Sequence, residues 1–553
     1  MTTRELLRSL PATVALSALL AAGLPSRAPA EPAASLEQQA NKAYATRDFA
    51  ACGSLYLAAA AEGGDPAGDY YNAACCFAQA GKPDDAFAAL ERAIAAGFSD
   101  TDHAKVDTDL TSLHTDARWQ PLLDRAAAEA KADKEFWDGP SMQTPYRPNL
   151  SEDEKIAGLS KLWAEAKFNF IYFDRVPNLN WDAVYMEYLP RVRASKSTLE
   201  YYRLLIEMAA RLKDGHTGVW MPKELGDEVY ATPLLRTALV EGTVVVTAVA
   251  PSLSSTGIVP GAEIVAIDGR PVKEYARERV APSMSSSTPQ DLDARTYGYA
   301  LLQGPRRAPV ALTLRDAAGR TFTRSVPRVS GAEAWKTWSR EPMAFRMLPG
   351  NIAYVALNTF NEAKTADMFE AAFPEIAKAD ALILDVRENG GGNSSIGDRI
   401  LACLTDRPIP VAPWDTRDYR PTYRAWGRRE GRFTAPGDSM PPNGKLLFTK
   451  PVVVLTSPRT FSAAEDFSAT FRDMKRGRII GEPTGGSTGQ PLSFPLPGGG
   501  GARICTRHCT FADGTEFVGV GILPDVKVAP TLADLRAGRD TVLEAALREL
   551  GRR

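Results

Sequence analysis

The sequence predicts a multidomain α/β protein. In the second half of the chain, apolar strand-like runs such as Ala381–Val386 and Pro451–Thr456 alternate with segments of helical periodicity. The part that follows the N-terminus is instead rich in alanine and other helix formers. Between these parts, alternating apolar residues and Gly/Pro turns, as in Val244–Val249 and Pro260–Val272, indicate a β-rich segment. Three compositions in one chain of 553 residues predict several domains.

The N-terminus has the pattern of an export signal. Arg4 and Arg8 precede the apolar stretch Pro11–Leu24, and Ala28-Pro-Ala30 offers small residues for cleavage. The apolar stretch is too short to span a bilayer comfortably. We therefore expect residues 1–30 to be a cleaved signal peptide and the remaining chain to be soluble, in the periplasm or secreted. The net charge of −2 does not favour nucleic acid as a partner.

Residues 31–135 are predicted to be helical and repeat weakly every 34 residues, so that Cys52 matches Ala86 and Ala59 matches Ala93. This spacing is typical of tetratricopeptide repeats, in which small residues let paired helices pack closely. A groove for a protein partner and a plain helical bundle are both compatible with the pattern. Residues 136–150, which contain Gly, Pro, Ser and Asn, are predicted to be a linker.

The six cysteines of an exported chain permit disulfides. Cys52 has two candidate partners between neighbouring helices, Cys75 and Cys76, whereas Cys505 can reach Cys509 only if the backbone bends between them. Cys505, His508 and Cys509 are an alternative metal-ligand set, but no fourth ligand is evident. We expect no metal and no cofactor.

A nucleophilic serine is predicted at Ser462. It follows the apolar strand Pro451–Thr456 and stands at the start of a helix whose Phe467 and Phe471 have helical spacing. A helix N-terminus offers unpaired N–H groups and a partial positive charge to an oxyanion. Ser462-x-x-Glu465 is also a capping box, which is the structural alternative.

The base for this serine must come from four histidines, His103, His114, His216 and His508. His216 stands on an Asp-Gly turn directly after the amphipathic run Tyr201–Leu212, whereas His103 and His114 lie in the separate helical region. A solvated or capping histidine is the structural alternative. A third element is the glycine-rich turn Gly390–Gly392 after the strand Ala381–Val386, where a backbone N–H can closely approach a carbonyl.

Four motifs carry a resemblance to a known family. Asp385–Gly392, Phe461–Glu465, Gly481–Thr484 and Gly519–Asp525 occur in the order seen in tail-specific and tricorn-core serine peptidases. The chain resembles a member of that family from about Leu150 to Pro530. The resemblance implies a crotonase-like β/α catalytic core at 340–530, preceded by a helical segment at 151–225 and an inserted PDZ-like β domain at 226–335. A C-terminal helix is expected at 531–553.

The resemblance also implies roles for single residues. The tail-specific branch has a catalytic lysine where this chain has Ser487, so the tricorn-like branch, with a histidine base, is the better match and His216 is the expected base. Glu516 is the expected orienting acid if Thr515–Val520 is a strand, and a solvent-facing strand glutamate is the other interpretation. Gly390, Gly391 and Ala463 would form the oxyanion hole, and Gly486 and Ser487 would bind substrate.

The function that follows is peptide hydrolysis by an exported serine peptidase acting on polypeptides. Two alternatives remain. A binding protein would keep the fold without turnover and use the tetratricopeptide-like and PDZ-like parts as peptide grooves. An esterase would use the same Ser–His pair on non-peptide acyl groups.

Overall fold

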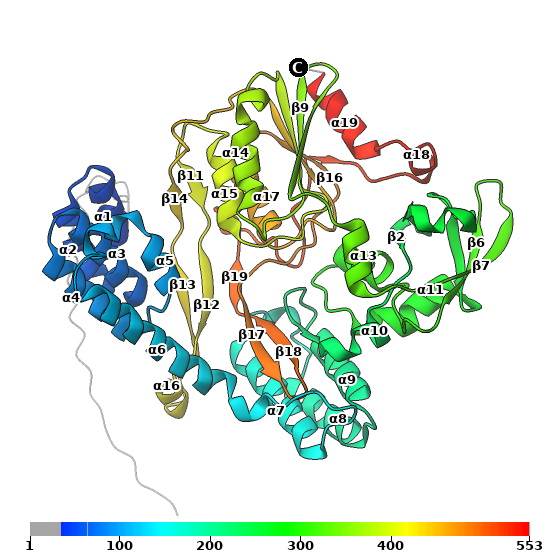
Figure 1. Ribbon diagram of the computed structural model, residues 1–553, viewed down its shortest axis with the longest axis horizontal. Coiled ribbons are helices and arrows are strands. Elements are labelled where there is room, and N and C mark those ends of the chain that lie inside the picture. The colour runs from blue at the N-terminus through cyan, green and yellow to red at the C-terminus, as the bar shows by residue number, and fades with distance from the viewer. Residues whose placement is uncertain (1–34, 63–64, 552–553) are drawn as a thin grey trace, which may run out of the picture. The chain divides into compact units, whose positions relative to one another are not determined.

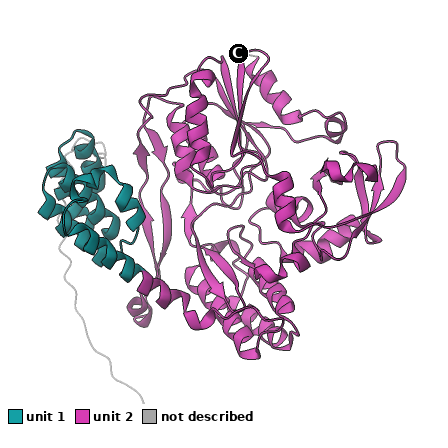
Figure 2. Ribbon diagram, in the orientation of Figure 1, with its two compact units in different colours: residues 1–130 teal, residues 131–553 magenta. Residues whose placement is uncertain are grey.

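The chain forms two compact units, residues 1–130 and 131–553, in a computed structural model that describes residues 35–62 and 65–551 (Figures 1 and 2). The predicted signal peptide, residues 1–30, lies outside the described residues. Among the helices of the described part, none combines the length and the apolarity that a bilayer crossing requires.

Unit 1 is helical, as predicted. Small buried residues such as Ala73, Ala86 and Ala93 let its helices pack closely. Its assignment to tetratricopeptide repeats remains a prediction. The helix α6 ends at Asp138, so the predicted linker at 136–150 begins about three residues too early. The elements are α1 (Leu36–Ala45), α2 (Phe49–Glu62), α3 (Pro66–Gln79), α4 (Pro83–Ala95), α5 (Thr101–Val106), η1 (Thr108–Leu113) and α6 (Trp119–Asp138), the last of which extends beyond residue 130.

A disulfide joins Cys52 of α2 to Cys76 of α3. Of the two pairings that the sequence left open, the structure therefore has the one with Cys76, and Cys75 is a buried free thiol. Cys505 and Cys509 are also buried free thiols and do not pair with each other.

Unit 2 begins with three helices that cover one face of a small antiparallel sheet with the strand order β1-β18-β17. Ser151 and Glu154 form the predicted capping box at the start of α7. Ala502 and Ile504 of β18 are fully buried in the same cluster as the helices. The elements are α7 (Glu152–Asn169), α8 (Trp181–Ala194), α9 (Thr198–Ala210), β1 (Gly218–Trp220), β17 (Pro491–Leu496) and β18 (Gly500–Cys505).

The β-rich insertion has its own sheet and its own apolar core. The strand order is β2-β3-β4-β6-β7, and β5 pairs with β4. This agrees with a β domain at 226–335, while its PDZ-like character remains a prediction. The elements are α10 (Gly226–Val229), β2 (Leu235–Val240), β3 (Thr243–Val249), β4 (Glu263–Ile267), β5 (Arg270–Pro271), α11 (Val272–Tyr275), η6 (Ala276–Val280), α12 (Pro289–Asp293), η8 (Ala294–Ala300), β6 (Val310–Arg315) and β7 (Thr321–Val326), followed by α13 (Gly331–Trp338).

The largest core surrounds a six-stranded sheet with the order β20-β16-β15-β10-β9-β8, parallel except for β8 (Figure 1). Leu382 and Leu384 of β10 pack into the cluster that contains α14, α15 and α17, whereas Ile383 packs against α19. A strand covered on both faces explains its unbroken apolar run. The elements are β8 (Met343–Leu348), β9 (Ile352–Leu357), α14 (Lys364–Ile376), β10 (Ala381–Asp385), α15 (Ser394–Ala402), β15 (Val452–Thr456), α17 (Ala463–Asp473), β16 (Arg478–Gly481), β20 (Val526–Lys527), α18 (Leu532–Arg536) and α19 (Thr541–Leu550).

A β extension interrupts the core between β10 and β15. Its sheets pair β11 with β14, and β12 with both β13 and β19. The expected strand Thr515–Val520 does not form, since only an isolated bridge joins Glu516 to Thr510 and a turn follows. The elements are β11 (Ile409–Val411), β12 (Trp414–Asp418), α16 (Pro421–Ala425), β13 (Gly431–Ala435), β14 (Asp438–Met440) and β19 (Arg507–Cys509).

The disulfide predicts a specific loss of stability in unit 1. Replacing Cys52→Ser opens a covalent loop with a sequence separation of 24, and the added chain entropy of the unfolded state should lower the local free energy of unfolding by about 3 kcal/mol. Hydrogen exchange of residues 36–113 measures this loss. Cys75→Ala, which removes the adjacent free thiol, is the control. Equal protection against hydrogen exchange in Cys52→Ser and in Cys75→Ala would contradict the prediction.

Candidate active site

Ser462 is held in a strained turn between a strand and a helix. The turn connects β15 to α17, and Ser462 has φ +56° and ψ −128°, a region that side-chain-bearing residues rarely adopt. Its N–H donates to the carbonyl of Ser487 at 3.1 Å, and the N–H of Phe461 donates to the carbonyl of Asn389 at 3.1 Å. Both neighbouring loops therefore fix the turn that presents the hydroxyl.

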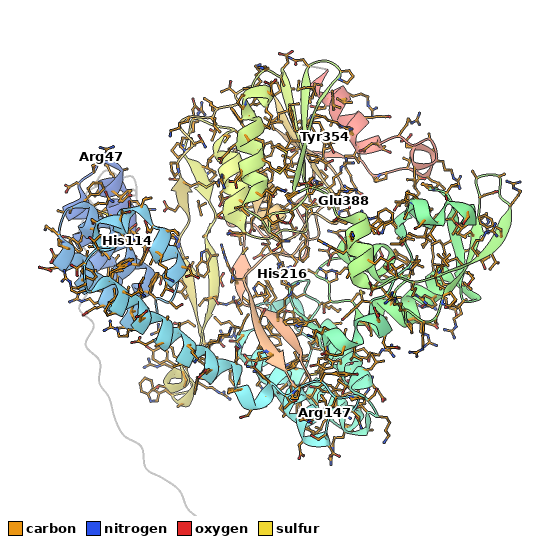
Figure 3. The ribbon with its side chains drawn as sticks, viewed as in Figure 1. Arg47, His114, Arg147, His216, Tyr354 and Glu388 are labelled. Atoms are coloured by element: carbon orange, nitrogen blue, oxygen red, sulfur yellow. A yellow bond between two sulfur atoms is a disulfide. The ribbon has the colours of Figure 1, made fainter. Side chains whose placement is uncertain are left out.

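His216 lies within hydrogen-bond distance of this hydroxyl. The distance from its Nε2 to Ser462 Oγ is 2.9 Å, although the two residues are 246 positions apart. In Figure 3, His216 lies between the six-stranded sheet and helices α7–α9. The imidazole is buried and stacks on the ring of Phe461, with ring centroids 4.7 Å apart and planes 13° from parallel. The structure thus brings together the two residues that the sequence nominated as nucleophile and base.

The other ring nitrogen of His216 faces Ser487. Nδ1 lies 2.8 Å from Ser487 Oγ, and that hydroxyl lies 3.4 Å from Asp214 Oδ1. Since a carboxylate only accepts, the Ser487 hydroxyl donates to Asp214 and accepts from Nδ1–H, which leaves the Nε2 lone pair directed at Ser462. Ser487 was predicted to bind substrate, but its fully buried side chain contacts the histidine instead.

Asp214 is positioned by its own turn and by the β-rich insertion. Its Oδ2 accepts the backbone N–H of His216 at 3.1 Å, and its Oδ1 accepts the Ser287 hydroxyl at 3.3 Å. Ser287 Oγ in turn accepts the N–H of Gly215 at 2.9 Å. A Cβ on Gly215 would lie 2.9 Å from the Phe461 ring, so the position has no room for a side chain.

Glu516 does not orient His216. Its carboxylate accepts from His508 Nε2 at 2.6 Å and from Arg175 at 2.9 Å. The prediction failed because it assumed a regular strand at Thr515–Val520, where alternation would have turned Glu516 toward the site. The other ring nitrogen of His508, Nδ1, lies 2.6 Å from Asp415 Oδ2. Because both ring nitrogens contact carboxylates, His508 is not free to bind a metal together with Cys505 and Cys509.

The surroundings of His216 keep the imidazole neutral. Burial lowers its pKa from 6.5 to about 3, and the positive charges of Arg503 and Arg295 act in the same direction. Arg295 forms an ion pair with Asp291 and lies over the Phe461 ring, 5.0 Å from its centroid. A neutral imidazole is the form that can accept a proton from a serine.

A second buried carboxylate, Glu465, joins the nucleophile turn to the loop that carries Ser487. It accepts from the hydroxyl of Thr484 at 2.5 Å and from the backbone N–H groups of Gly486 and Ser487 at 2.7 and 2.9 Å. It also accepts from the N–H of Ser462 at 3.3 Å, as the capping-box interpretation requires. Burial raises the pKa of Glu465 to about 8, while these donors oppose the shift.

Two of the three predicted oxyanion donors are unpaired. The N–H groups of Gly390 and Ala463 have no acceptor among the described residues, whereas the N–H of Gly391 donates to Asn389 Oδ1 at 2.9 Å. Gly391 instead provides a close approach: its φ is +96°, and a Cβ there would lie 2.6 Å from Ser462 Cβ. Of the three predicted donors, Gly390 and Ala463 therefore keep an N–H group that is available to a ligand.

Gly486 does not face a substrate. It is buried, its N–H donates to Glu465, and its carbonyl accepts from the N–H of Gly519 at 2.7 Å. The prediction placed it in the binding wall because it precedes Ser487, but in the structure the loop is framework for the histidine.

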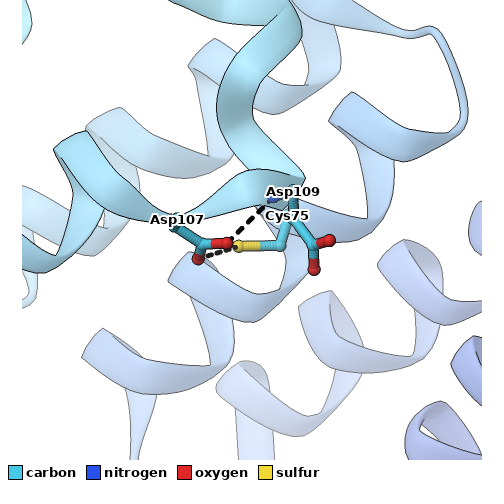
Figure 4. A group of neighbouring side chains, drawn as sticks. All are labelled: Cys75, Asp107 and Asp109. Atoms are coloured by element: carbon cyan, nitrogen blue, oxygen red, sulfur yellow. Dashed lines mark hydrogen bonds between the residues drawn. The ribbon is translucent and has the colours of Figure 1, made fainter.

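One group of possible metal ligands occurs among the described residues, and it belongs to unit 1. Cys75, Asp107 and Asp109 have ligand atoms within 4.8 Å of one another (Figure 4). Asp107 accepts from the Tyr71 hydroxyl at 2.8 Å and from the Cys75 thiol at 3.5 Å, and Asp109 accepts from Tyr44 at 2.7 Å. Burial raises the pKa of the Cys75 thiol, so the thiol is protonated at neutral pH and acts as a hydrogen-bond donor.

Three groups that shape the site were not predicted from the sequence. They are Asp214, Ser287, and Glu465 in its role of holding two loops together. Asp214 had a signal, since it lies two residues before His216. Glu465 had one too, but the capping box was weighed only as an alternative to a reactive serine, whereas in the structure the capping serine also contacts His216. Ser287 comes from the insertion, and only the tertiary fold places it here.

The arrangement can perform acyl transfer. A serine in contact with a neutral histidine, a free N–H group on the next residue, Ala463, and a polar chain that fixes the histidine tautomer are components of nucleophilic catalysis. Buried hydrogen bonds hold the components before any substrate arrives.

Comparisons with known proteins point to peptidases. Residues 351–528 match peptidase family S41. The chloroplastic C-terminal processing peptidase of Tetradesmus obliquus is 29% identical over 261 residues, 45% of this chain and 51% of that protein. The carboxyl-terminal-processing protease of Synechocystis sp. is 25% identical over 425 residues, 73% of this chain and 88% of that protein. The chain thus spans about half the length of the first of these relatives.

A solved structure supports the fold. Mature CPAF complexed with lactacystin superposes with a TM-score of 0.55 and covers 72% of this chain and 98% of its own. At 14% identity, this likeness concerns the fold alone.

The contact of Ser487 with His216 predicts which replacement slows the serine. Ser487→Ala removes the acceptor of Nδ1–H, so reaction of Ser462 with a fluorophosphonate should slow about 100-fold. Glu516→Gln is the matched control and should react at the wild-type rate, because Glu516 contacts His508 and Arg175. The reverse ranking of the two variants would reject the assignment.

The lowered pKa of His216 predicts the acid limit of this reaction. The labelling rate should hold as the pH falls through 6.5 and decline only toward about pH 3, where the folded protein protonates His216. Between about pH 3 and pH 6.5 the unfolded chain binds a proton at His216 and the folded protein does not. His216 therefore leaves the free energy of unfolding unchanged above pH 6.5 and lowers it as the pH falls below that value. Labelling rates across pH, paired with denaturant titrations, measure both effects. A midpoint near 6.5 would contradict the prediction.

Proposed function

We propose that the chain is an exported serine peptidase that hydrolyses peptide bonds of polypeptides, and the match of residues 351–528 to peptidase family S41 supports this proposal. The observation that carries the proposal is the 2.9 Å approach of Ser462 Oγ to His216 Nε2. The neutral state of the imidazole, whose pKa burial lowers to about 3, supports the same role.

The proposed reaction runs through an acyl-enzyme. His216 Nε2 takes the Ser462 proton as Oγ bonds to the peptide carbonyl carbon, and the N–H groups of Ala463 and Gly390 bind the oxyanion. The imidazolium then protonates the leaving amine as the C–N bond breaks. Water, deprotonated by the same nitrogen, attacks the ester and releases Ser462 with its proton.

The orienting group in this proposal is a relay of a hydroxyl and a carboxylate. Nδ1–H of His216 donates to Ser487, which donates to Asp214. As Nε2 gains a proton, the positive charge on the ring develops next to this chain, so buried Asp214 stabilises it through Ser487. In this proposal Ser487 stands where tail-specific enzymes have their lysine, His216 takes over the role of base, and Asp214 takes the orienting role that was expected of Glu516.

The other parts of the chain have proposed roles in delivery of the substrate. The insertion at 226–335 is proposed to be PDZ-like, and its sheet with an edge strand, β2, supports a peptide groove. The helical region at 31–135 is proposed to bind a protein partner in the manner of tetratricopeptide repeats. Residues 1–30 are proposed to direct export to the periplasm or the exterior.

Replacement of the two reacting residues tests the peptidase proposal. Ser462→Ala should abolish both fluorophosphonate labelling and hydrolysis of a denatured protein, and His216→Ala should reduce both at least about 1000-fold. Ser468→Ala is the matched control, because its hydroxyl donates to the carbonyl of Ala464 on the same helix, with no other partner in the described part of the chain, and lies outside the proposed machinery.

Two outcomes would overturn this assignment. Absence of label on the wild-type enzyme, together with retained peptide binding, would identify a binding protein. Label that depends on Ser462, with turnover of a simple ester and none of a denatured protein or peptide, would identify an esterase.

A further inference from the structure

Arg503 occupies the outward face of the small sheet that follows His216. It lies on β18, directly opposite Gly218 of β1 and Ser493 of β17. Its neighbours Ala502 and Ile504 are buried in the cluster with helices α7–α9, and side chains alternate along a strand. The Arg503 side chain therefore extends from the face opposite these helices.

That face has room for a side-chain atom at Gly218, and an aromatic ring lies on it. Gly218 has no side chain, and the nearest atom to a Cβ built there is Ser285 Oγ, at 3.9 Å. Gly501 precedes Arg503 by two positions on β18, so the two residues share a face. A Cβ on Gly501 would lie 2.4 Å from the ring of Trp220, and this ring therefore covers Gly501. Trp220 is 43% exposed. Arg503 thus lies between a partly exposed indole and a gap that is left by a glycine.

The guanidinium of Arg503 lacks a partner. Among the described residues, it forms neither a hydrogen bond nor an ion pair, whereas nearby Arg295 is paired with Asp291. Arg503 is only partly exposed. Removing a charged group from water is costly unless an opposite charge compensates for it, so an unpaired, half-buried guanidinium favours an anionic ligand.

This position is close to the reacting atoms. Gly218 follows His216 by two residues, and the charges of Arg503 and Asp214 influence each other. Arg503 is also the nearby charge that most strongly lowers the pKa of His216. The loop of Ser285 also carries Ser287, which bonds to Asp214. A group bound by Arg503 would lie beside the catalytic histidine.

We propose that Arg503 binds a carboxylate of the polypeptide substrate near the scissile bond, with Trp220 as the apolar wall of the same subsite. The inference rests on the proposed peptidase function and adds a preference that the catalytic residues do not supply. Guanidinium and carboxylate match in a two-point hydrogen bond. The carboxylate comes either from an Asp or Glu side chain or from the substrate C-terminus.

A comparison of paired peptides tests the subsite. One series carries Glu or the isosteric Gln at each position within three residues of the cleaved bond, and a second series has a free or an amidated C-terminus. The readout is the ratio of kcat/KM between the acid and the amide member of each pair. An effect that Arg503→Gln exerts through His216 or through folding changes both members equally and cancels in the ratio.

The wild-type enzyme should prefer the acid member of at least one pair by about 10- to 100-fold, and Arg503→Gln should bring that ratio close to one. Arg503→Lys should retain part of the preference, and Arg193→Gln, on the surface of α8, should retain all of it. The pair that responds identifies the source of the carboxylate, side chain or terminus.

Two results would overturn the inference. Ratios near one for every pair in the wild-type enzyme would reject it, and so would a preference that survives in Arg503→Gln. Fluorophosphonate labelling of the wild-type enzyme is measured in parallel. Label without an acid preference rejects this inference alone, whereas absence of both label and peptide turnover rejects the proposed function and the inference with it.

Discussion

The site depends on one buried carboxylate, that of Glu465. It receives donors from both loops that flank His216: the N–H of Ser462 on the nucleophile side, and Thr484, Gly486 and Ser487 on the other. Because the bonds to Thr484, Gly486 and Ser487 are buried, they are stronger than the same bonds in water and hold the two loops together. The imidazole of His216 lies between the hydroxyls of Ser487 and Ser462. Glu465 fixes the backbone of both serines without a hydrogen bond to the imidazole.

Electrostatics and packing act together on the imidazole. The Phe461 ring covers one face of His216, burial disfavours the charged form, and the arginines nearby add to that effect. Buried Asp214 provides the opposing negative charge at the far end of the Ser487 relay. The histidine is therefore neutral at rest, and its charged form has compensation within reach when a proton arrives.

Much of this could be predicted from the sequence, and the failures have physical causes. The contact between Ser462 and His216 could be anticipated because the local patterns, strand to helix and helix to turn, place both side chains at the ends of regular elements. Glu516 was misassigned because alternation was applied to a segment that forms a turn. Gly391 and Ser487 lie in the site, but their roles differ from the predicted ones. Their hydrogen-bond partners, Asn389 and His216, are fixed by tertiary contacts that no local pattern encodes.

The insertion reaches into the site through a short loop. Ser287 bonds to Asp214 and Gly215, and Thr288 donates to the carbonyl of Gly485 at 2.8 Å. Residues 226–335 are therefore not an interchangeable module. A chimera with a homologous insertion from another protein, or a deletion joined at its ends, would lose these hydrogen bonds to the turn that carries His216. A transplant of this domain would therefore have to include both the loop of Ser287 and Thr288 and the residues of the core that this loop contacts.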